Sequence, residues 1–163
     1  MTKKNMEEFS ISTSLGSNFI RLNKPIAIVD CHGVTNFSSL DGFMNHYQRL
    51  GLSEFIFFTD STDGEVQDTL HRRLGDQGIS ILIIDDKDQK NKWTQISKYL
   101  LSKDIGPWVV AINYEEYYYY GMQEVMNIQA FVDYLDHYGY DGVFATEVEF
   151  CLLYTSPSPR DRG

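Results

Sequence analysis

The sequence predicts a doubly wound α/β fold, in which helices cover both faces of a mostly parallel sheet. Short apolar runs alternate with helical patterns across residues 25–150, in the order β-α-β-α-β-α-β-α-β. The connections are short, and right-handed crossovers then place the strands parallel to one another. Polar residues follow several of the apolar runs, at the strand ends where open α/β sheets bind their ligands.

Three apolar runs are predicted as buried strands, at residues 26–29, 54–58 and 79–84. A fifth strand is expected from residue 142 to 145, extended by Val148 and Phe150. Residues 1–24 are polar and are expected to form a lead-in, with a short edge strand at residues 19–22.

Apolar residues spaced three or four apart predict a helix after each of the first four strands. The apolar positions that define these helices are Leu40, Phe43, Met44, Tyr47 and Leu50; Val66, Leu70 and Leu74; Trp93, Ile96 and Leu100; and Ile128, Phe131, Val132 and Leu135. Ser38 and Asn127 are the expected N-terminal caps of the first and fourth helices, and Gly51 is a plausible stop. Gly42 costs helix stability relative to Ala, so we expect close packing around it.

Residues 108–112 form a continuous apolar run after a proline, which is typical of the middle strand of a parallel sheet covered on both faces. Asn113, Glu115 and Glu116 follow at its carboxyl end. With residues 60–63 and 85–88, they give three acidic loops that we expect to converge at one edge of the sheet. Hard cations such as Mg²⁺ and Mn²⁺ prefer oxygen ligands of this kind. The alternative is that both glutamates are simply solvated.

The loop after the first strand, residues 30–35, contains neither the glycine pattern of dinucleotide-binding folds nor that of P-loops. His32 lies in this loop and is a candidate ligand contact because of its place at a strand end. His46 lies beside the apolar face of the first helix, where a packed structural role is the favoured interpretation.

The chain carries a net charge of −9, which argues against nucleic acid or an anionic membrane surface as a partner. No stretch approaches the ~20 apolar residues of a membrane span, and the start lacks the apolar core of a signal peptide. Cys31 is the only cysteine before residue 151, so no disulfide framework is expected. A cytoplasmic protein is the resulting expectation.

Two segments resemble glycosyltransferases of the family 2-like and family 92-like group. Residues 42–58 run into a Ser-Thr-Asp-Gly turn at residues 61–64, and this resembles the family's helix ending His-x-x-x-x-Gly, hydrophobic strand and Ser-Thr-Asp-Gly turn. Residues 108–117 resemble its Trp-hydrophobic-Asp-x-Asp-Glu-Phe segment. The resemblance covers roughly residues 26–150. It implies a GT-A fold, a nucleotide-diphosphate sugar donor, a glycan or other hydroxyl acceptor, and a divalent metal, Mn²⁺ or Mg²⁺.

Carried over residue by residue, the resemblance assigns metal binding to Asn113, Glu115 and Glu116. It places Asp60 and Asp63 near the donor nucleoside, while Asp30 is a donor contact by position. Asn113 stands where the family has Asp, so one negative charge of the metal site is lost. The catalytic base and acceptor region are expected beyond Phe150.

Two other functions stay open at this stage. Residues 28–35 also resemble the Asp-x-Asp-Gly-x-Thr signature of haloacid-dehalogenase-like phosphatases, with Asp30 as nucleophile and His32 in place of the second Asp. The third possibility is a non-catalytic glycosyltransferase-like module that lost its metal site at Asn113.

Residues 151–161 resemble the translation of a transposase adapter used in sequencing libraries. We therefore assign residues 25–150 to the nucleotide-sugar-binding part of a glycosyltransferase domain, and residues 151–163 to a non-native tail. By this interpretation the natural chain is truncated at its C-terminal side and continues past Phe150.

Overall fold

The computed structural model describes residues 11–15, 24–60, 64–75, 80–84, 91–102 and 108–143. Within these ranges the chain forms a mixed α/β fold of five strands and four helices. The strands are β1 (Ile11–Leu15), β2 (Ile26–Asp30), β3 (Glu54–Asp60), β4 (Ser80–Ile84) and β5 (Val109–Asn113). The helices are α1 (Leu40–Arg49), α2 (Gly64–Leu74), α3 (Lys92–Ser102) and α4 (Ile128–His137).

All five strands belong to one sheet, in the order β1-β4-β3-β2-β5. Strands β2 to β5 run parallel through three pairings, and β1 joins antiparallel to β4. The chain therefore moves outward from β2 through β3 to β4, and then returns to place β5 on the other side of β2. The prediction of a mostly parallel sheet is confirmed, whereas the doubly wound GT-A assignment stays a prediction.

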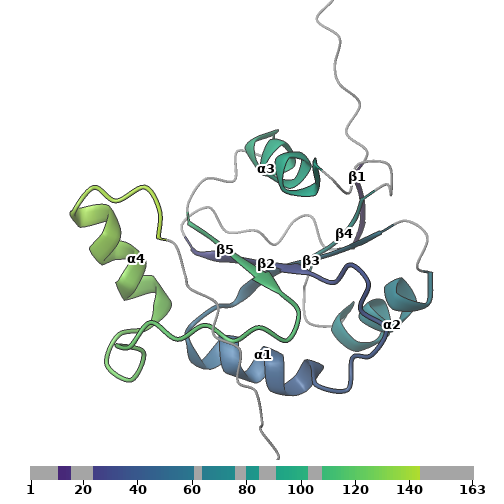
Figure 1. Ribbon diagram of the computed structural model, residues 1–163, viewed down its shortest axis with the longest axis horizontal. Coiled ribbons are helices and arrows are strands. Elements are labelled where there is room, and N and C mark those ends of the chain that lie inside the picture. Colours follow the sequence, from purple (N-terminus) through teal and green to yellow (C-terminus); the bar gives the residue numbers. More distant parts are fainter. Residues whose placement is uncertain are drawn as a thin grey trace, which may run out of the picture.

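Helices cover both faces of the sheet, with α3 on one side and α1 and α2 on the other (Figure 1). Two apolar clusters fill the spaces between these layers. The smaller cluster joins β2 and β3 to α3 and consists of Ile26, Ile28, Ile56, Phe58, Ile96, Tyr99 and Leu100. The larger cluster contains the opposite faces of β2 and β3, the apolar sides of α1 and α2, and Ile128 of α4.

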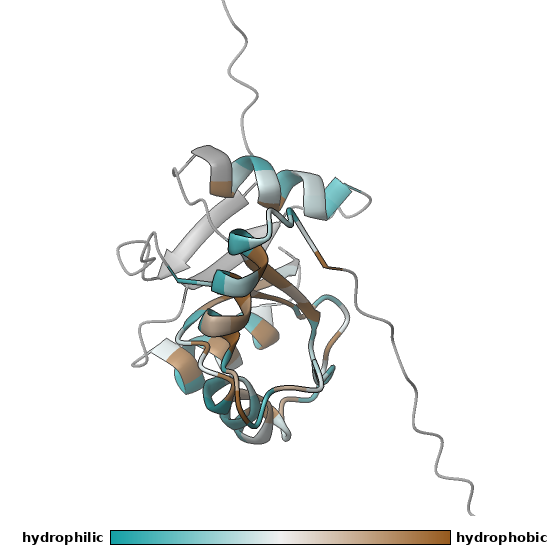
Figure 2. Cartoon of the chain, turned by 90° about the vertical axis from the view of Figure 1, so that its left-hand side faces the viewer, coloured by the Kyte–Doolittle hydropathy of each residue, from teal (hydrophilic) through white to brown (hydrophobic). Residues whose placement is uncertain are grey.

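Strand β2 is buried at all five positions, as the continuous apolar run predicts for a strand covered on both faces. Hydrophobic colouring is concentrated on the sheet in Figure 2, and hydrophilic colouring on the outer turns of the helices. The sheet is thus the centre of the core, and β2 contributes side chains to the apolar clusters on both of its faces.

Strand β5 is an edge strand of the described sheet, so the prediction that it lies in the middle was wrong. Its positions alternate between exposed and more buried, with Val109, Ala111 and Asn113 exposed and Ile112 buried. Apolar content alone does not distinguish an edge strand from a central one, because position in a sheet is set by non-local pairing.

The structure confirms several other sequence predictions and contradicts some, while others fall outside the described residues. The four predicted helices are present, and Asn127 caps α4 by accepting a hydrogen bond from the Ala130 amide. A strand occurs in the lead-in at β1, while the predicted one at residues 19–22 lies outside the described residues. Residues 142 and 143 are not in a strand, and residues 144–150 lie outside the description.

No helix in the described ranges is both long enough and apolar enough to cross a membrane.

Helix α1 ends in a Schellman motif at Gly51, as the stop signal indicates. The Gly51 amide donates to the Gln48 carbonyl and the Leu52 amide to the Tyr47 carbonyl, both at 3.0 Å. Gly51 has a φ of 96°, which glycine adopts without steric cost. The Leu50 carbonyl then accepts from the Ile128 amide at 2.8 Å, so this end of α1 also holds the start of α4.

Gly42 is exposed, and a Cβ built there meets nothing within 4 Å, so the expected close packing is absent. We predict that Gly42→Ala raises the free energy of unfolding by about 0.5–1 kcal/mol, because Ala loses less backbone entropy in a helix. Gly51→Ala is the matched variant: its Cβ would lie 3.4 Å from the Asn127 Cβ in a left-handed backbone, so stability should fall. Urea unfolding checks both, and equal effects of the two would contradict the analysis.

Candidate functional site

The carboxyl ends of β2 and β5 lie side by side at the point where the strand order reverses. Asp30 is in register with Asn113, and the Tyr114 amide donates to the Asp30 carbonyl at 2.9 Å. In open α/β sheets, such a reversal separates the loops after the two strands and leaves a crevice for ligands. Two of the residues that the sequence singled out, from segments far apart in the chain, therefore meet at this edge.

Asp30 is buried, with 6% of its surface exposed, and its carboxylate is fully engaged. One oxygen, Oδ1, accepts from the His32 amide at 2.8 Å, and Oδ2 forms an ion pair with Lys92 Nζ. A buried carboxylate without such partners would carry a large desolvation cost. Lys92 begins α3 and also lies 5.8 Å from the centre of the Phe58 ring, so it closes this end of the core.

Two tight turns follow the paired strands. In the first, the Val34 amide donates to the Cys31 carbonyl and Gly33 has a φ of 74°. Such a turn exposes His32, whose backbone amide stays fixed on Asp30. Burial, together with the charge of Asp30, raises the pKa of the Cys31 thiol and so favours its neutral form.

The second turn, residues 113–116, has a similar shape with a glutamate in the strained position. The Glu116 amide donates to the Asn113 carbonyl at 3.0 Å, and Glu115 has a φ of 72°. A third turn residue with positive φ is ordinarily Gly or Asn, and a larger residue there costs about 1–3 kcal/mol. Neighbouring contacts must hold Glu115 in this conformation.

Ser39 supplies one such contact. Its Oγ donates to Glu115 Oε1 at 2.5 Å and lies 2.9 Å from the Tyr114 hydroxyl. Ser39, and not Ser38, is the N-cap residue of α1, and its side chain makes no capping hydrogen bond. The hydroxyl that would ordinarily cap the helix instead ties the start of α1 to the turn after β5.

Glu116 is engaged by Asn113 through both carboxylate oxygens. Oε2 accepts from the Asn113 amide at 3.0 Å and Oε1 from Asn113 Nδ2 at 2.6 Å. Trp108 and Tyr114 form backbone hydrogen bonds with β2, so the alternate residues of β5, Asn113 included, direct their backbone groups to the free edge. Glu116 therefore gives a partner to the Asn113 amide, a backbone group on the open edge of β5.

Tyr47 and Tyr118 complete the closure of this edge. The Tyr47 hydroxyl donates to the Glu116 carbonyl at 2.7 Å and lies 3.2 Å from the Tyr118 amide, which donates to it. The Tyr118 hydroxyl donates in turn to the Ala111 carbonyl at 2.5 Å. Burial raises the pKa of both phenols above the ordinary value, which keeps them protonated as donors.

The residues present do not form a ready site for the divalent metal that the resemblance implies. Glu115 is held by Ser39, while Glu116 is held by Asn113. Among the described residues, no three His, Cys, Asp or Glu side chains come together as a ligand set. Metal ligands must converge on one point with open lone pairs, and here the two carboxylates have separate partners. We therefore derive no chemical step through a metal.

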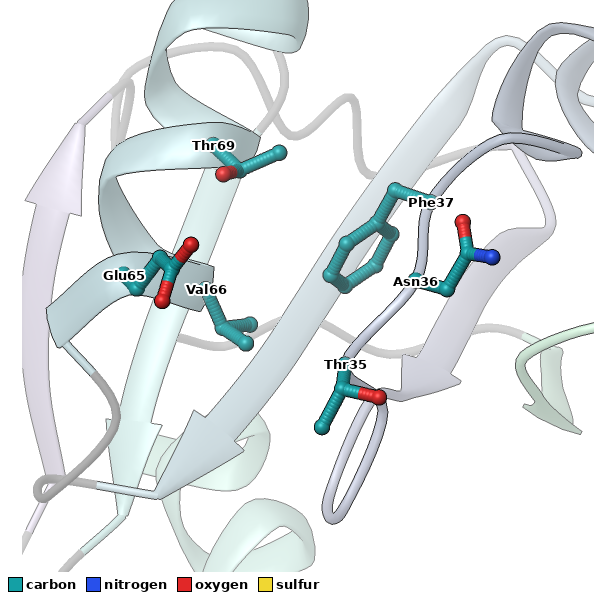
Figure 3. A pocket seen from close by; sticks show the side chains of 6 residues that line it. All are labelled: Thr35, Asn36, Phe37, Glu65, Val66 and Thr69. Atoms are coloured by element: carbon teal, nitrogen blue, oxygen red, sulfur yellow. The ribbon is translucent and has the colours of Figure 1, made fainter.

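A pocket of about 150 Å³ lies between the loop after β2 and the start of α2. Thr35, Asn36 and Phe37 line it from the loop, and Glu65, Val66 and Thr69 from the helix, with the Phe37 ring pointing toward α2 (Figure 3). Ligand pockets usually measure ~300–1,000 Å³, so this one is too small for a sugar nucleotide. None of the expected site residues lines it.

Of the expected site residues, the structure brings Asp30, Asn113 and Glu116 to one edge, with Glu115 in the same turn. His32 is exposed beside them. Asp60 ends β3 at the same edge, but its side chain, like Asp63 and residues 85–88, lies outside the description.

Three important residues escaped the sequence analysis: Ser39, Lys92 and Tyr47. Each acts on a partner more than sixty residues away. The sequence offered only a weak signal for one of them, namely that two adjacent serines precede α1 and both cannot be its cap.

By its fold and candidate site, this chain is an α/β protein with a mostly parallel sheet. Polar residues lie at the strand ends where the strand order reverses. Comparisons with protein-family models, with curated proteins and with solved structures found no match to this chain.

We predict that Glu116→Gln lowers the free energy of unfolding by about 1 kcal/mol or more, because a charged acceptor of two hydrogen bonds is lost. Glu124→Gln, at an exposed glutamate nearby in the chain, should leave stability unchanged. Urea unfolding with and without Mn²⁺ is the measurement. A metal site would behave in the opposite way: removing a carboxylate would relieve repulsion in the metal-free protein and abolish stabilisation by Mn²⁺.

Alkaline pH should destabilise the fold through its buried phenols. The folded-state pKa of Tyr47 lies above the unfolded value of about 10. The folded state thus binds the proton more tightly, and its stability falls as pH rises above about 10. Tyr47→Phe should reduce this slope while costing about 1–2 kcal/mol at neutral pH through lost hydrogen bonds. Urea midpoints measured across this pH range would contradict the analysis if wild type and variant gave the same slope.

Proposed function

We propose that this domain is the donor-binding part of a glycosyltransferase, and that a nucleotide-diphosphate sugar binds at the carboxyl ends of β2 and β5. Sugar transfer to a glycan or other hydroxyl acceptor is the activity that follows from this proposal. A GT-A, doubly wound arrangement is the corresponding fold proposal. The cytoplasm is the proposed location, and the free, buried Cys31 among the described residues is in keeping with a reducing compartment.

One observation carries the proposal: the strand order reverses between β2 and β5, and residues 108–117, one of the two segments that resemble glycosyltransferases, contribute one side of this reversal. Asp30 and Asn113 are in register across the reversal. The segment resembling the family's Trp-to-Phe motif contributes β5 and its turn. Ligands of open α/β sheets bind at such a place, which makes it the natural position for a nucleotide.

The diphosphate of a donor needs positive charge or amide donors nearby. Lys92 lies at this edge, 23% exposed, with its ammonium on Asp30. The ion pair has no net charge, so Asp30 does not repel an anion as a free carboxylate would. The neutral pair therefore leaves no net negative charge at this point to repel the diphosphate. The proposal leaves metal assistance outside it, for the geometric reason given above.

A non-catalytic binding module is the second candidate, and a specific observation favours it. Both glutamates of the turn are engaged in holding the fold, which leaves neither free to act on a substrate. Binding of the donor without its hydrolysis or transfer would support this candidate. The phosphatase alternative assigns the nucleophile to Asp30, which is buried and bonded through both oxygens, to the His32 amide and to Lys92.

The proposal is tested by titrating isotope-labelled protein with a panel of nucleotide-diphosphate sugars and following backbone amide shifts by NMR. We expect the largest changes at His32, Asn113 and Tyr114. His32→Ala should weaken binding several-fold, since its side chain is exposed at the strand end, while His71→Ala on α2 should not. The proposal would be overturned if the largest changes in amide chemical shift fell away from these residues. It would also be overturned if no sugar nucleotide changed any amide shift. Phosphate-ester hydrolysis abolished by Asp30→Asn would favour the phosphatase.

A further inference from the structure

The negative charge of the protein is concentrated in one part of the chain. Residues 1–103 contain thirteen acidic and twelve basic residues, close to balance. Residues 104–150 contain nine acidic residues and no Lys or Arg. Of this part, the structure describes residues 108–143, which carry β5, its turn and α4 and contain six acidic residues and no Lys or Arg. In Figure 1, α4 and the segment that leads to it lie at one side of the sheet.

The same part of the chain is rich in tyrosine, and the four consecutive tyrosines at residues 117–120 alternate in their surroundings. Tyr118 and Tyr120 face inward: their hydroxyls donate to the Ala111 and Met126 carbonyls at 2.5 Å. Tyr117 and Tyr119 face outward, with 42% and 70% of their surfaces exposed. An extended backbone gives this period of two.

The outward rings stand on a backbone that is held firmly. Tyr47 bonds the backbone on either side of Tyr117, and His46 Nε2 lies 3.1 Å from the Tyr118 carbonyl. The His46 ring packs between the two exposed rings, with centroid separations of 5.0 Å to Tyr117 and 5.4 Å to Tyr119. Rigid aromatic side chains of this kind dominate binding energy at protein interfaces, because little entropy is lost when they are covered.

We propose that Tyr117 and Tyr119 form a docking surface for a basic protein segment rich in Lys and Arg. The occupant follows from charge complementarity. Exposed Glu115 and Glu124 flank the tyrosines in the chain, and the described segment that carries them, residues 108–143, contains no Lys or Arg. Lys and Arg are attracted to aromatic faces by cation–π interaction, and the surrounding negative potential accelerates their approach. Tyr117 and Tyr119 are not among the residues proposed to contact the donor.

The test is fluorescence anisotropy of a labelled peptide of alternating Lys and Arg, titrated with the full chain at physiological ionic strength. The double variant Tyr117→Ala/Tyr119→Ala should weaken binding by about tenfold or more. Glu124→Lys should weaken it further and flatten its salt dependence. The matched control is Tyr134→Ala/Tyr138→Ala, which removes two exposed rings, one on α4 and one at its C-cap, from the same anionic part of the chain and should leave affinity unchanged.

Each other outcome overturns the proposal. Equal weakening by both double variants would show general attraction to a negative surface. Equal binding of an acidic peptide, or no binding by wild type, would exclude a basic partner. Concentration-dependent dimerisation abolished by Tyr117→Ala/Tyr119→Ala would show that a second copy covers these rings. Amide NMR spectra of each variant confirm that it is folded, and a more conservative pair, Tyr117→Leu/Tyr119→Leu, replaces the alanine pair if folding fails.

Discussion

The complete burial of β2 is the constraint on which the rest of this structure depends. A strand covered on both faces needs an apolar side chain at every position and a hydrogen-bonding partner on each edge. Residues 26–29 meet the first requirement, and β3 and β5 meet the second. The last residue of the strand, Asp30, is charged, and burying it requires the opposite charge of Lys92. The start of α3 is thereby fixed over the end of β2.

The edge position of β5 determines the character of the turn that follows it. An edge strand leaves backbone groups without partners, and this protein satisfies several of them with its own side chains. Glu116 and Tyr118 bind backbone groups of β5, and Ser39 and Tyr47 reach the same turn from α1. Glu115 and Glu116, which the resemblance assigns to metal binding, are thus engaged in holding the turn at the edge of the sheet. For this reason the proposed nucleotide binding does not depend on the metal that the resemblance implies.

In residues 117–120, inward-facing and outward-facing tyrosines alternate, so the segment that covers the edge of β5 also forms part of the outer surface. Because Tyr118 and Tyr120 anchor the backbone, Tyr117 and Tyr119 are presented outward without freedom to fold back. Their position in the anionic part of the chain gives this surface a chemical preference. One local segment therefore serves the stability of the edge strand and supplies an exposed aromatic surface.

Local periodicity and turn chemistry in the sequence were enough to predict β2, β3 and β4, the four helices, the Asn127 cap and the Gly51 stop. These features depend on neighbouring residues, so a local pattern is enough to predict them. Packing between distant segments places β5 at the edge of the described sheet and pairs Asp30 with Lys92. The tertiary structure also decided that Glu115 and Glu116 have separate partners. These outcomes depend on which distant segments pack together, and neither composition nor spacing along the chain specifies that.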